Sequence, residues 1–491
     1  MIQVDIAEKQ QHKKLFVTWS ITFLILFPVL ITLGFLMRAK QGQLIDISMN
    51  KFYSFMTLHG LGMAGVLFSI AIASLYYLIG TRYARLSIKT GYFAYYFIVI
   101  GVVGLVIGTL IGEFGAGWYM LYPLPFKGAY WTEWSIGMSF FSILILGVAW
   151  LIQCLHILIE LSRNYGGFKN MIGWQYFSKN SPVKELPSIV LISTISLLAS
   201  VFAVLAGAVM DILFLMQYFE PSLELDPLMM KNIIFFFGHT IVNATMYLGI
   251  AWLYALLPEF TKRDWKVTKL VVIAWNCTFF FILFAYFHHL YMDFVQPMSL
   301  QYIGQFASYF SSIPATAVTM FGVIGQFYRS KTRWSMVPTM FLLGVAGWAI
   351  GGFAAVVDST ITINKVLHNT LWVPAHFHTY MLMGIVLIIF AFLYYISANE
   401  NTDNDIKPGL SFWVFMGGSY GFLLMFYLGG LYSIPRRFSD YAGIDTSAVR
   451  ETGTTLAQIA AFSVLILLIA LLSMYVKLIK RLFHSLKTIT V

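Results

Sequence analysis

Charged side chains are scarce in this chain. Asp, Glu, Lys and Arg make up 11% of its 491 residues, whereas hydrophobic residues make up 59%. A water-soluble or disordered protein of this length could not keep so large an apolar fraction away from water. The composition therefore excludes those classes and indicates a membrane protein.

Cysteine is almost absent as well. The two cysteines, Cys154 and Cys277, fall in separate apolar runs, which excludes a disulfide framework and a thiolate metal motif. The chain also lacks a haem c attachment sequence and a binuclear copper motif. Any metal chemistry must therefore come from the ten histidines.

Apolar runs long enough to cross a bilayer recur along the whole sequence. About 20 apolar residues in a helix span a hydrocarbon core of about 30 Å. The runs are 15–37, 56–80, 91–113, 137–160, 187–215, 232–257, 268–290, 306–327, 334–357, 371–396, 409–433 and 456–476. We therefore predict an all-α membrane protein of about twelve transmembrane helices that forms a single transmembrane domain over residues 1–491.

The positive charge follows this topology. The net charge of +10 would suggest nucleic-acid binding in a soluble protein. Here, most of the 31 lysines and arginines fall on one side if the N-terminus is cytoplasmic. The positive-inside rule then predicts that both termini are cytoplasmic, and it explains the basic charge without a nucleic-acid partner.

Six of the ten histidines fall at one depth of the predicted membrane. They lie near the outer ends of four helices: His59, His239, His288, His289, His376 and His378. Ionisable residues inside a membrane are costly and usually face the bundle interior, where they have a function. Neutral imidazole is a common ligand of iron and copper, so this layer predicts a cofactor site.

The spacing of these histidines refines the prediction. His376 and His378 are about 200° apart around a helix, so one helix can present ligands to cofactors on two sides. His288 and His289 are adjacent, about 100° apart, and can converge on one metal ion if a third ligand joins them. His239 is the candidate for that third ligand.

With this ligand order and twelve helices, the chain resembles subunit I of the haem-copper oxidase superfamily over roughly residues 15 to 480. The resemblance implies a membrane-bound catalytic domain with two haems, one low-spin and one high-spin, at least one of them b-type. It implies that His59 and His378 are the axial ligands of the low-spin haem. His376 is then the proximal ligand of the high-spin haem.

The same resemblance assigns the other residues of the layer. His239, His288 and His289 would bind a copper ion facing the high-spin haem, with iron as an alternative. Arg436 and Arg437 follow the eleventh helix and resemble the family's partners for haem propionates, since guanidinium groups make bidentate contacts to carboxylates.

The segment before the tenth helix resembles the B-type branch of the superfamily. Asp358, His368 and Asn369 are similar to the polar cap above the active-site haem, so His368 is a further cofactor-binding candidate. The resemblance also implies a bacterial or archaeal inner membrane. Electrons would come from a small second subunit with an electron-entry centre, or from quinol.

One position departs from the oxygen-reducing pattern. A- and B-type oxygen reductases carry a tyrosine four residues after the first copper ligand, and this chain has Asn243 there. Since an amide cannot supply an electron and a proton as a phenol does, we predict that the chain reduces two NO to N₂O and water. Asn243 lies one turn from His239 and could donate a hydrogen bond to the bound substrate. The absence of glutamate near the three histidines favours copper over iron.

Two alternatives remain open on the sequence. An oxygen reductase is possible if another helix supplies the tyrosine, with Tyr286 and Tyr247 as candidates. A transporter or channel with histidine-bound metal would have twelve helices but would not explain His376 and His378 on opposite sides of one helix.

For protons, Tyr254, Thr316 and Thr319 are candidates for a path from the cytoplasmic side.

Overall fold

The computed structural model describes residues 4–128, 130–178, 185–293, 295–403 and 406–487. Across these ranges the chain is helical and forms no β-strand, only an isolated bridge between Thr370 and Pro435. Lys179 and Lys184, which the charge analysis places on the cytoplasmic side, lie outside the described residues.

Twelve of the described helices are long and apolar enough to cross a membrane, which confirms the predicted fold class. These spans are α1 (Ile6–Gln41), α2 (Met49–Arg82), α3 (Ile88–Val106) with η1 (Ile107–Ile111), α5 (Glu133–Tyr165), α7 (Ser188–Phe219), α8 (Pro227–Thr261), α9 (Lys269–Ala285) with η3 (Tyr286–Leu290), α10 (Met298–Phe327), α11 (Met336–Ser359), α13 (Trp372–His378) with η4 (Thr379–Val386) and α14 (Leu387–Ser397), α15 (Leu410–Leu431) and α16 (Ser447–Lys487). Four short helices, α4 (Leu124–Lys127), α6 (Phe168–Met171), η2 (Trp174–Phe177) and α12 (Ile361–Leu367), lie in the connections.

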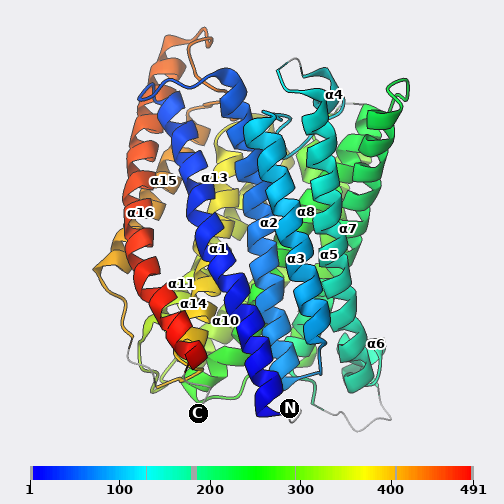
Figure 1. Cartoon of the computed structure of the whole chain (residues 1–491), viewed down its shortest axis with the longest axis vertical. Coiled ribbons are helices and arrows are strands. Elements are labelled where there is room, and N and C mark those ends of the chain that lie inside the picture. Colours follow the sequence, from blue (N-terminus) through cyan, green and yellow to red (C-terminus); the bar gives the residue numbers. More distant parts are fainter. Residues whose placement is uncertain (1–3, 129, 179–184, 294, 404–405, 488–491) are drawn as a thin grey trace.

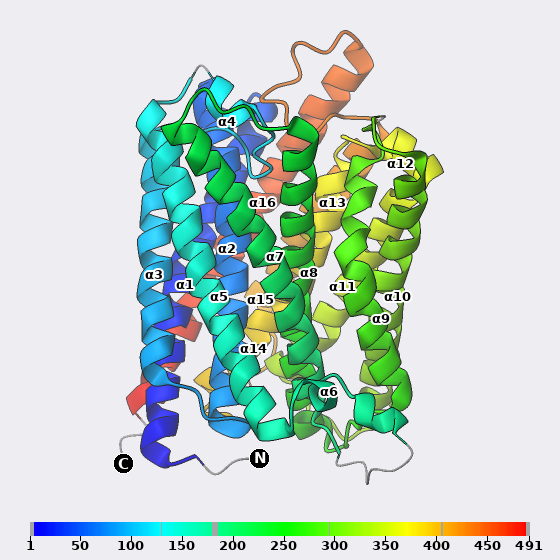
Figure 2. The same cartoon turned by 90° about the vertical axis from the view of Figure 1, so that its right-hand side faces the viewer.

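The long helices stand side by side in one bundle (Figures 1 and 2). The first residues of α1 and the last residues of α16 lie at the same end of the bundle, as an even number of spans requires (Figure 1). Large apolar side chains such as Phe321, Phe353 and Ile469 are more than half exposed on the outside. A bilayer would cover such a surface. That this end faces the cytoplasm stays a prediction.

Capping side chains mark where the helices that carry the site begin. The Ser48 hydroxyl accepts a hydrogen bond from Lys51 N at the start of α2, and the Asp226 carboxylate accepts one from Met229 N at the start of α8. Both satisfy backbone donors that a helix leaves free in its first turn. Pro227 follows directly in α8, at a position where its missing N–H costs nothing.

The tenth span lies at the centre of the bundle and is almost entirely buried. The sequence predicts one helix over 371–396, but the structure has a π-helical stretch, η4, directly after His378. Helix α11 packs closely against η4 because it presents glycines: a Cβ at Gly347 would lie 2.1 Å from Met383 O, and one at Gly351 would lie 2.7 Å from Tyr380 N. This close approach fixes the position of Tyr380, and π-helical turns often occur at functional sites.

A network of charges joins the ends of three spans at the end of the bundle that holds the start of α1. Arg82 of α2 pairs with Glu259 of α8 and, at 2.8 Å, with Glu400, which follows α14. Tyr395 bridges the network by donating to Glu259 at 2.8 Å. The pairing satisfies charges that would be costly if buried alone.

Candidate metal centre

All six histidines of the predicted layer line one cavity of about 370 Å³. They reach it from α2, α8, η3 and α13. The depth argument made from the sequence therefore predicts the right neighbourhood for each of them. The remaining walls are mostly apolar and aromatic.

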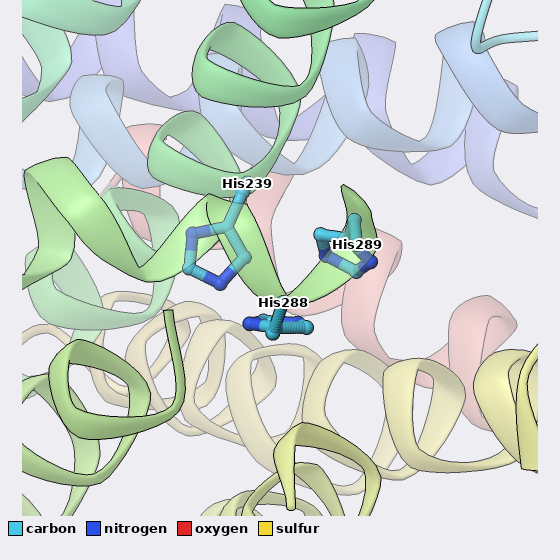
Figure 3. A group of neighbouring side chains, drawn as sticks. All are labelled: His239, His288 and His289. Carbon is cyan, nitrogen blue, oxygen red and sulfur yellow. The ribbon is translucent and has the colours of Figure 1, made fainter. Parts of the chain in front are cut away.

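Three of these histidines form a compact cluster (Figure 3). His239 of α8 and His288 and His289 of η3 each offer a ring nitrogen within 4.8 Å of the others. The ring centroids of His239 lie 5.0 Å from His288 and 5.4 Å from His289. Three imidazoles at this spacing could hold one metal ion of the copper or zinc type.

The surroundings of the cluster favour metal binding. His288 Nδ1 lies 2.9 Å from the Ser308 hydroxyl of α10, which orients the ring and leaves its Nε2 available. His239 Nδ1 is buried without a hydrogen-bond partner in the protein. A buried polar atom without a partner is unfavourable unless a ligand or water completes it, so these residues fit a metal ion.

His59 and His378 face each other on another side of the cavity. Their rings are nearly parallel, 18° apart, with centroids separated by 6.1 Å. His59 Nδ1 donates to Leu30 O and His378 Nδ1 donates to Pro374 O, each at 2.7 Å. Because a carbonyl only accepts, each Nδ1 carries the proton and each Nε2 keeps its lone pair. His59 and His378 could therefore together ligate one haem iron.

His376 lies two residues before His378 in α13 and also lines the cavity. Its Nε2 is 3.8 Å from the Asp358 carboxylate, and its Nδ1 is buried without a partner. His376 thus has a ring nitrogen available as a ligand, and it could hold a second haem. Asp358, predicted as part of a polar cap, is buried beside it and held by Asn364.

Arginines lie at the rim of the cavity. Arg436 donates to the Asn369 side chain at 2.9 Å, and burial together with the neighbouring Arg437 lowers its pKa to about 9. Arg437 lies over the Tyr119 ring at 3.7 Å, and its Nη2 is buried without a partner. Two adjacent guanidinium groups with spare donors suit carboxylates such as haem propionates. Arg38 of α1 also lines the cavity, although sequence reasoning had assigned it no role.

His368 is the one predicted cofactor-binding residue that is not among the cavity-lining residues. It follows α12, and its backbone N–H donates to Asn364 O. Burial, and then the charge of Arg436, lower the pKa of His368 to about 4. At neutral pH its ring is therefore uncharged, and any contact with a cofactor would be a hydrogen bond.

Asn243 lines the cavity one turn along α8 from His239, as predicted. Its Nδ2 donates to His239 O at 2.8 Å, and its Oδ1 accepts from the hydroxyl of Tyr380 at 2.9 Å. Sequence reasoning missed Tyr380. The available signal was its place four residues after His376, where a helix returns to the same face.

The two tyrosines predicted as alternatives have other partners. Tyr286 donates to the Asn232 side chain at 3.4 Å and does not line the cavity. Tyr247 lines the cavity, but its hydroxyl points to Ser311 O at 3.3 Å. The tyrosine whose hydroxyl contacts Asn243 is thus Tyr380, which was not among the predicted candidates.

The bundle and its histidine-lined cavity define a class of protein: a multi-pass membrane protein whose interior could hold metal cofactors. The chain belongs to the family described as cytochrome c and quinol oxidase polypeptide I, which it matches over residues 14–477. It is therefore a member of the haem-copper oxidase subunit I superfamily, and the predicted resemblance is confirmed. Members of this family generally bind haems and copper.

Individual relatives are distant. Cytochrome c oxidase subunit 1 of Pecten maximus is 27% identical over 342 residues, covering 67% of this chain and 68% of the relative. Alternative cytochrome c oxidase subunit 1 of Bradyrhizobium diazoefficiens is 23% identical over 478 residues, covering 89% and 77%. A solved heme-copper terminal oxidase dimer has the same fold, with a TM-score of 0.75 and 20% identity over 98% of this chain and 84% of that one.

Proposed function

We propose that this chain is the catalytic subunit of a terminal reductase that reduces O₂ to water. The observation that carries the proposal is the meeting of two histidine arrangements at one cavity. The facing pair, His59 and His378, suits a six-coordinate haem. The cluster of His239, His288 and His289 suits copper. His376 would hold a second haem. When bound, these groups would supply the electrons and the binding position for the gas.

The protein residues have separate tasks in this proposal. The Leu30 and Pro374 carbonyls fix the protonated nitrogens of His59 and His378, so the other nitrogens are directed to iron. The Ser308 hydroxyl holds Nδ1 of His288 in the same way, so that Nε2 of His288 would be free to bind copper. Arg436 and Arg437 would neutralise propionates at the rim. The apolar walls limit water, which strengthens these electrostatic interactions.

Two observations support oxygen as the substrate in this proposal, although nitric oxide was the preferred substrate on the sequence alone. The two relatives described above are named as subunits of cytochrome c oxidases. The argument against oxygen was the lack of a phenol next to the site, and the structure has the hydroxyl of Tyr380 on Asn243. Another helix thus supplies a tyrosine, although not one of those expected.

Reduction of NO to N₂O stays the second candidate because of Asn243. In this reaction two NO molecules take two electrons and two protons and yield N₂O and water. Asn243 uses its Oδ1 for Tyr380 and one N–H for His239 O. An amide nitrogen has two N–H groups, so one remains to donate to a bound N–O group.

A line of polar contacts between α8 and α10 supports proton supply from the end that holds the Arg82 network. Along α8, residues 247, 254 and 261 are spaced by seven and share one face. The Tyr247 hydroxyl donates to Ser311 O, the Tyr254 hydroxyl is 3.0 Å from that of Thr319, and Thr261 donates to Gln326. Of the three residues predicted for such a path, the structure joins Tyr254 and Thr319.

The deciding experiment is turnover of the purified, haem-replete complex with O₂ and with NO, using one electron donor for both. We expect rapid oxygen uptake without N₂O. Rapid N₂O formation with negligible oxygen uptake would establish the second candidate. Reaction with neither gas, despite reducible haems, would contradict both. Donor choice is tested in parallel with a quinol and with a reduced second subunit, since this chain has no electron-entry motif of its own.

A further inference from the structure

Tyr380 and Asn243 connect two helices just beyond the metal centre. Tyr380 lies four residues after His376, and Asn243 lies four residues after His239. The 2.9 Å hydrogen bond from the Tyr380 hydroxyl to Asn243 Oδ1 therefore joins the two spans that carry the candidate ligands His376 and His239. Both residues line the same cavity as those histidines.

The amide is held in one orientation. Its Nδ2 donates to the His239 carbonyl of its own helix, and this leaves Oδ1 directed at Tyr380. Tyr380 is buried and belongs to the π-helical stretch η4, against which Gly351 of α11 packs closely. The phenol therefore has little freedom to leave the cavity wall.

The pair also lies at the end of the polar line between α8 and α10. Tyr247 is one turn farther along α8 from Asn243 and lines the cavity as well. The contacts Tyr247 to Ser311 and Tyr254 to Thr319 continue from there, away from the metal centre. Tyr380 thus lines the same cavity as Tyr247 at the near end of this line and as the histidine cluster.

We propose that Tyr380 donates protons to the gas bound at the metal centre and that Asn243 is the positioning residue for its hydroxyl. The inference rests on the proposed function but applies to either gas, because O₂ reduction consumes four protons and NO coupling consumes two. In each transfer the hydroxyl turns from Asn243 Oδ1 toward the substrate, the phenolic O–H bond breaks and the proton passes to an oxygen atom of the substrate as it is reduced. The phenolate regains a proton from the side of Tyr247, so no further oxidant or reductant is needed.

The test compares Tyr380→Phe with Tyr427→Phe in the complete, haem-replete complex. Tyr427 is a matched control because its hydroxyl is 3.0 Å from that of Thr379, the neighbour of Tyr380, and it is not among the residues lining the cavity. Loss of a positioned proton donor slows a reaction by about 10²-fold or more. We expect Tyr380→Phe to slow turnover by about that factor and Tyr427→Phe to match the wild type.

Four measurements separate proton donation from packing. Haem absorbance and reduction by the donor should stay normal in Tyr380→Phe, whereas proton uptake, followed with a pH indicator in one turnover, should become slow. The infrared C–O stretch of bound carbon monoxide should shift, since the hydroxyl dipole faces the same cavity. Normal turnover in Tyr380→Phe would overturn the proposal, and so would slow turnover caused by lost haem or slow electron entry.

Asn243 is tested through a double-variant cycle. Asn243→Leu removes the acceptor at similar volume, and if Asn243 acts through Tyr380, the double variant should be no slower than Tyr380→Phe alone. Additive losses would overturn the positioning role. A wild-type complex that reduces neither gas would instead contradict the proposed function, so the two failures are distinguishable.

Discussion

The rings of His59 and His378 face each other at 6.1 Å across a gap between two helices far apart in sequence. Each ring is oriented by a backbone carbonyl, that of Leu30 for His59 and that of Pro374 for His378. The two facing rings could therefore ligate one haem iron, because the hydrogen bonds at Nδ1 leave both Nε2 atoms available.

Replacing His378 tests this pairing. We expect His378→Asn to abolish the spectrum of a six-coordinate haem while the second haem still binds carbon monoxide. Optical and electron paramagnetic resonance spectra of the purified complex measure both features. The control is His156→Asn, since His156 contacts Tyr76 at 3.0 Å and does not line the cavity. Loss of both haems in the control would show that the change in His378→Asn is not specific.

Ser308→Ala tests the support of the copper-type site. Removing the hydroxyl at 2.9 Å from His288 Nδ1 frees the ring to turn. Changes to such outer contacts typically cost about 10- to 100-fold in metal affinity. Metal content after dialysis against a chelator is the measurement, with haem content as the internal standard. Ser419→Ala should retain its metal, because that hydroxyl bonds only within α15.

The polar line between α8 and α10 predicts that substitutions of Thr319 and of the nearby Thr316 affect turnover differently. Thr319→Val removes the partner of Tyr254, so turnover should fall, and the fall should be largest in steps that take up protons. Thr316→Val, in the same helix, should have a small effect because Thr316 is not part of the contacts described above. Equal losses in the two variants would contradict a path along this line.

The environment of Glu400 predicts that the stability of the fold depends on pH. Burial raises the pKa of this carboxyl, but the Arg82 charge and a hydrogen bond from Tyr77 outweigh burial and hold it below the usual 4.5. The ionised group therefore stabilises the fold at neutral pH, and this contribution is lost as the pH falls below 4.5 through the folded-state pKa.

We expect Glu400→Gln to lower stability at neutral pH by about 2 kcal/mol, the scale of a charge-assisted hydrogen bond. It should also flatten the decline toward acid in thermal unfolding of the detergent-solubilised chain. Asp46→Asn is the control, because Asp46 pairs with Lys40 but its side chain is 97% exposed. A decline at acid pH that is unchanged in Glu400→Gln would rule out this carboxyl as its cause.

Much of the site was predictable because membrane topology restricts where residues can lie. Twelve apolar runs fix the alternation of the helices, and alternation alone brings histidines from distant positions to one depth. Helical spacing then predicts that His288 and His289 converge and that Asn243 shares a face with His239. The roles of these histidines as haem and metal ligands stay predictions, as does the cytoplasmic location of the termini.

The sequence by itself determined the membrane class, the helix count and the layer of histidines, since each follows from hydropathy and residue spacing along one helix, and its resemblance to known sequences indicated the family. Tertiary structure decided which side chains meet across helices. Tyr380 contacts Asn243 only because α11 packs on η4 through Gly347 and Gly351 and brings the tenth span against α8. Such contacts join residues more than a hundred positions apart, and helical periodicity says nothing about rotations between separate helices.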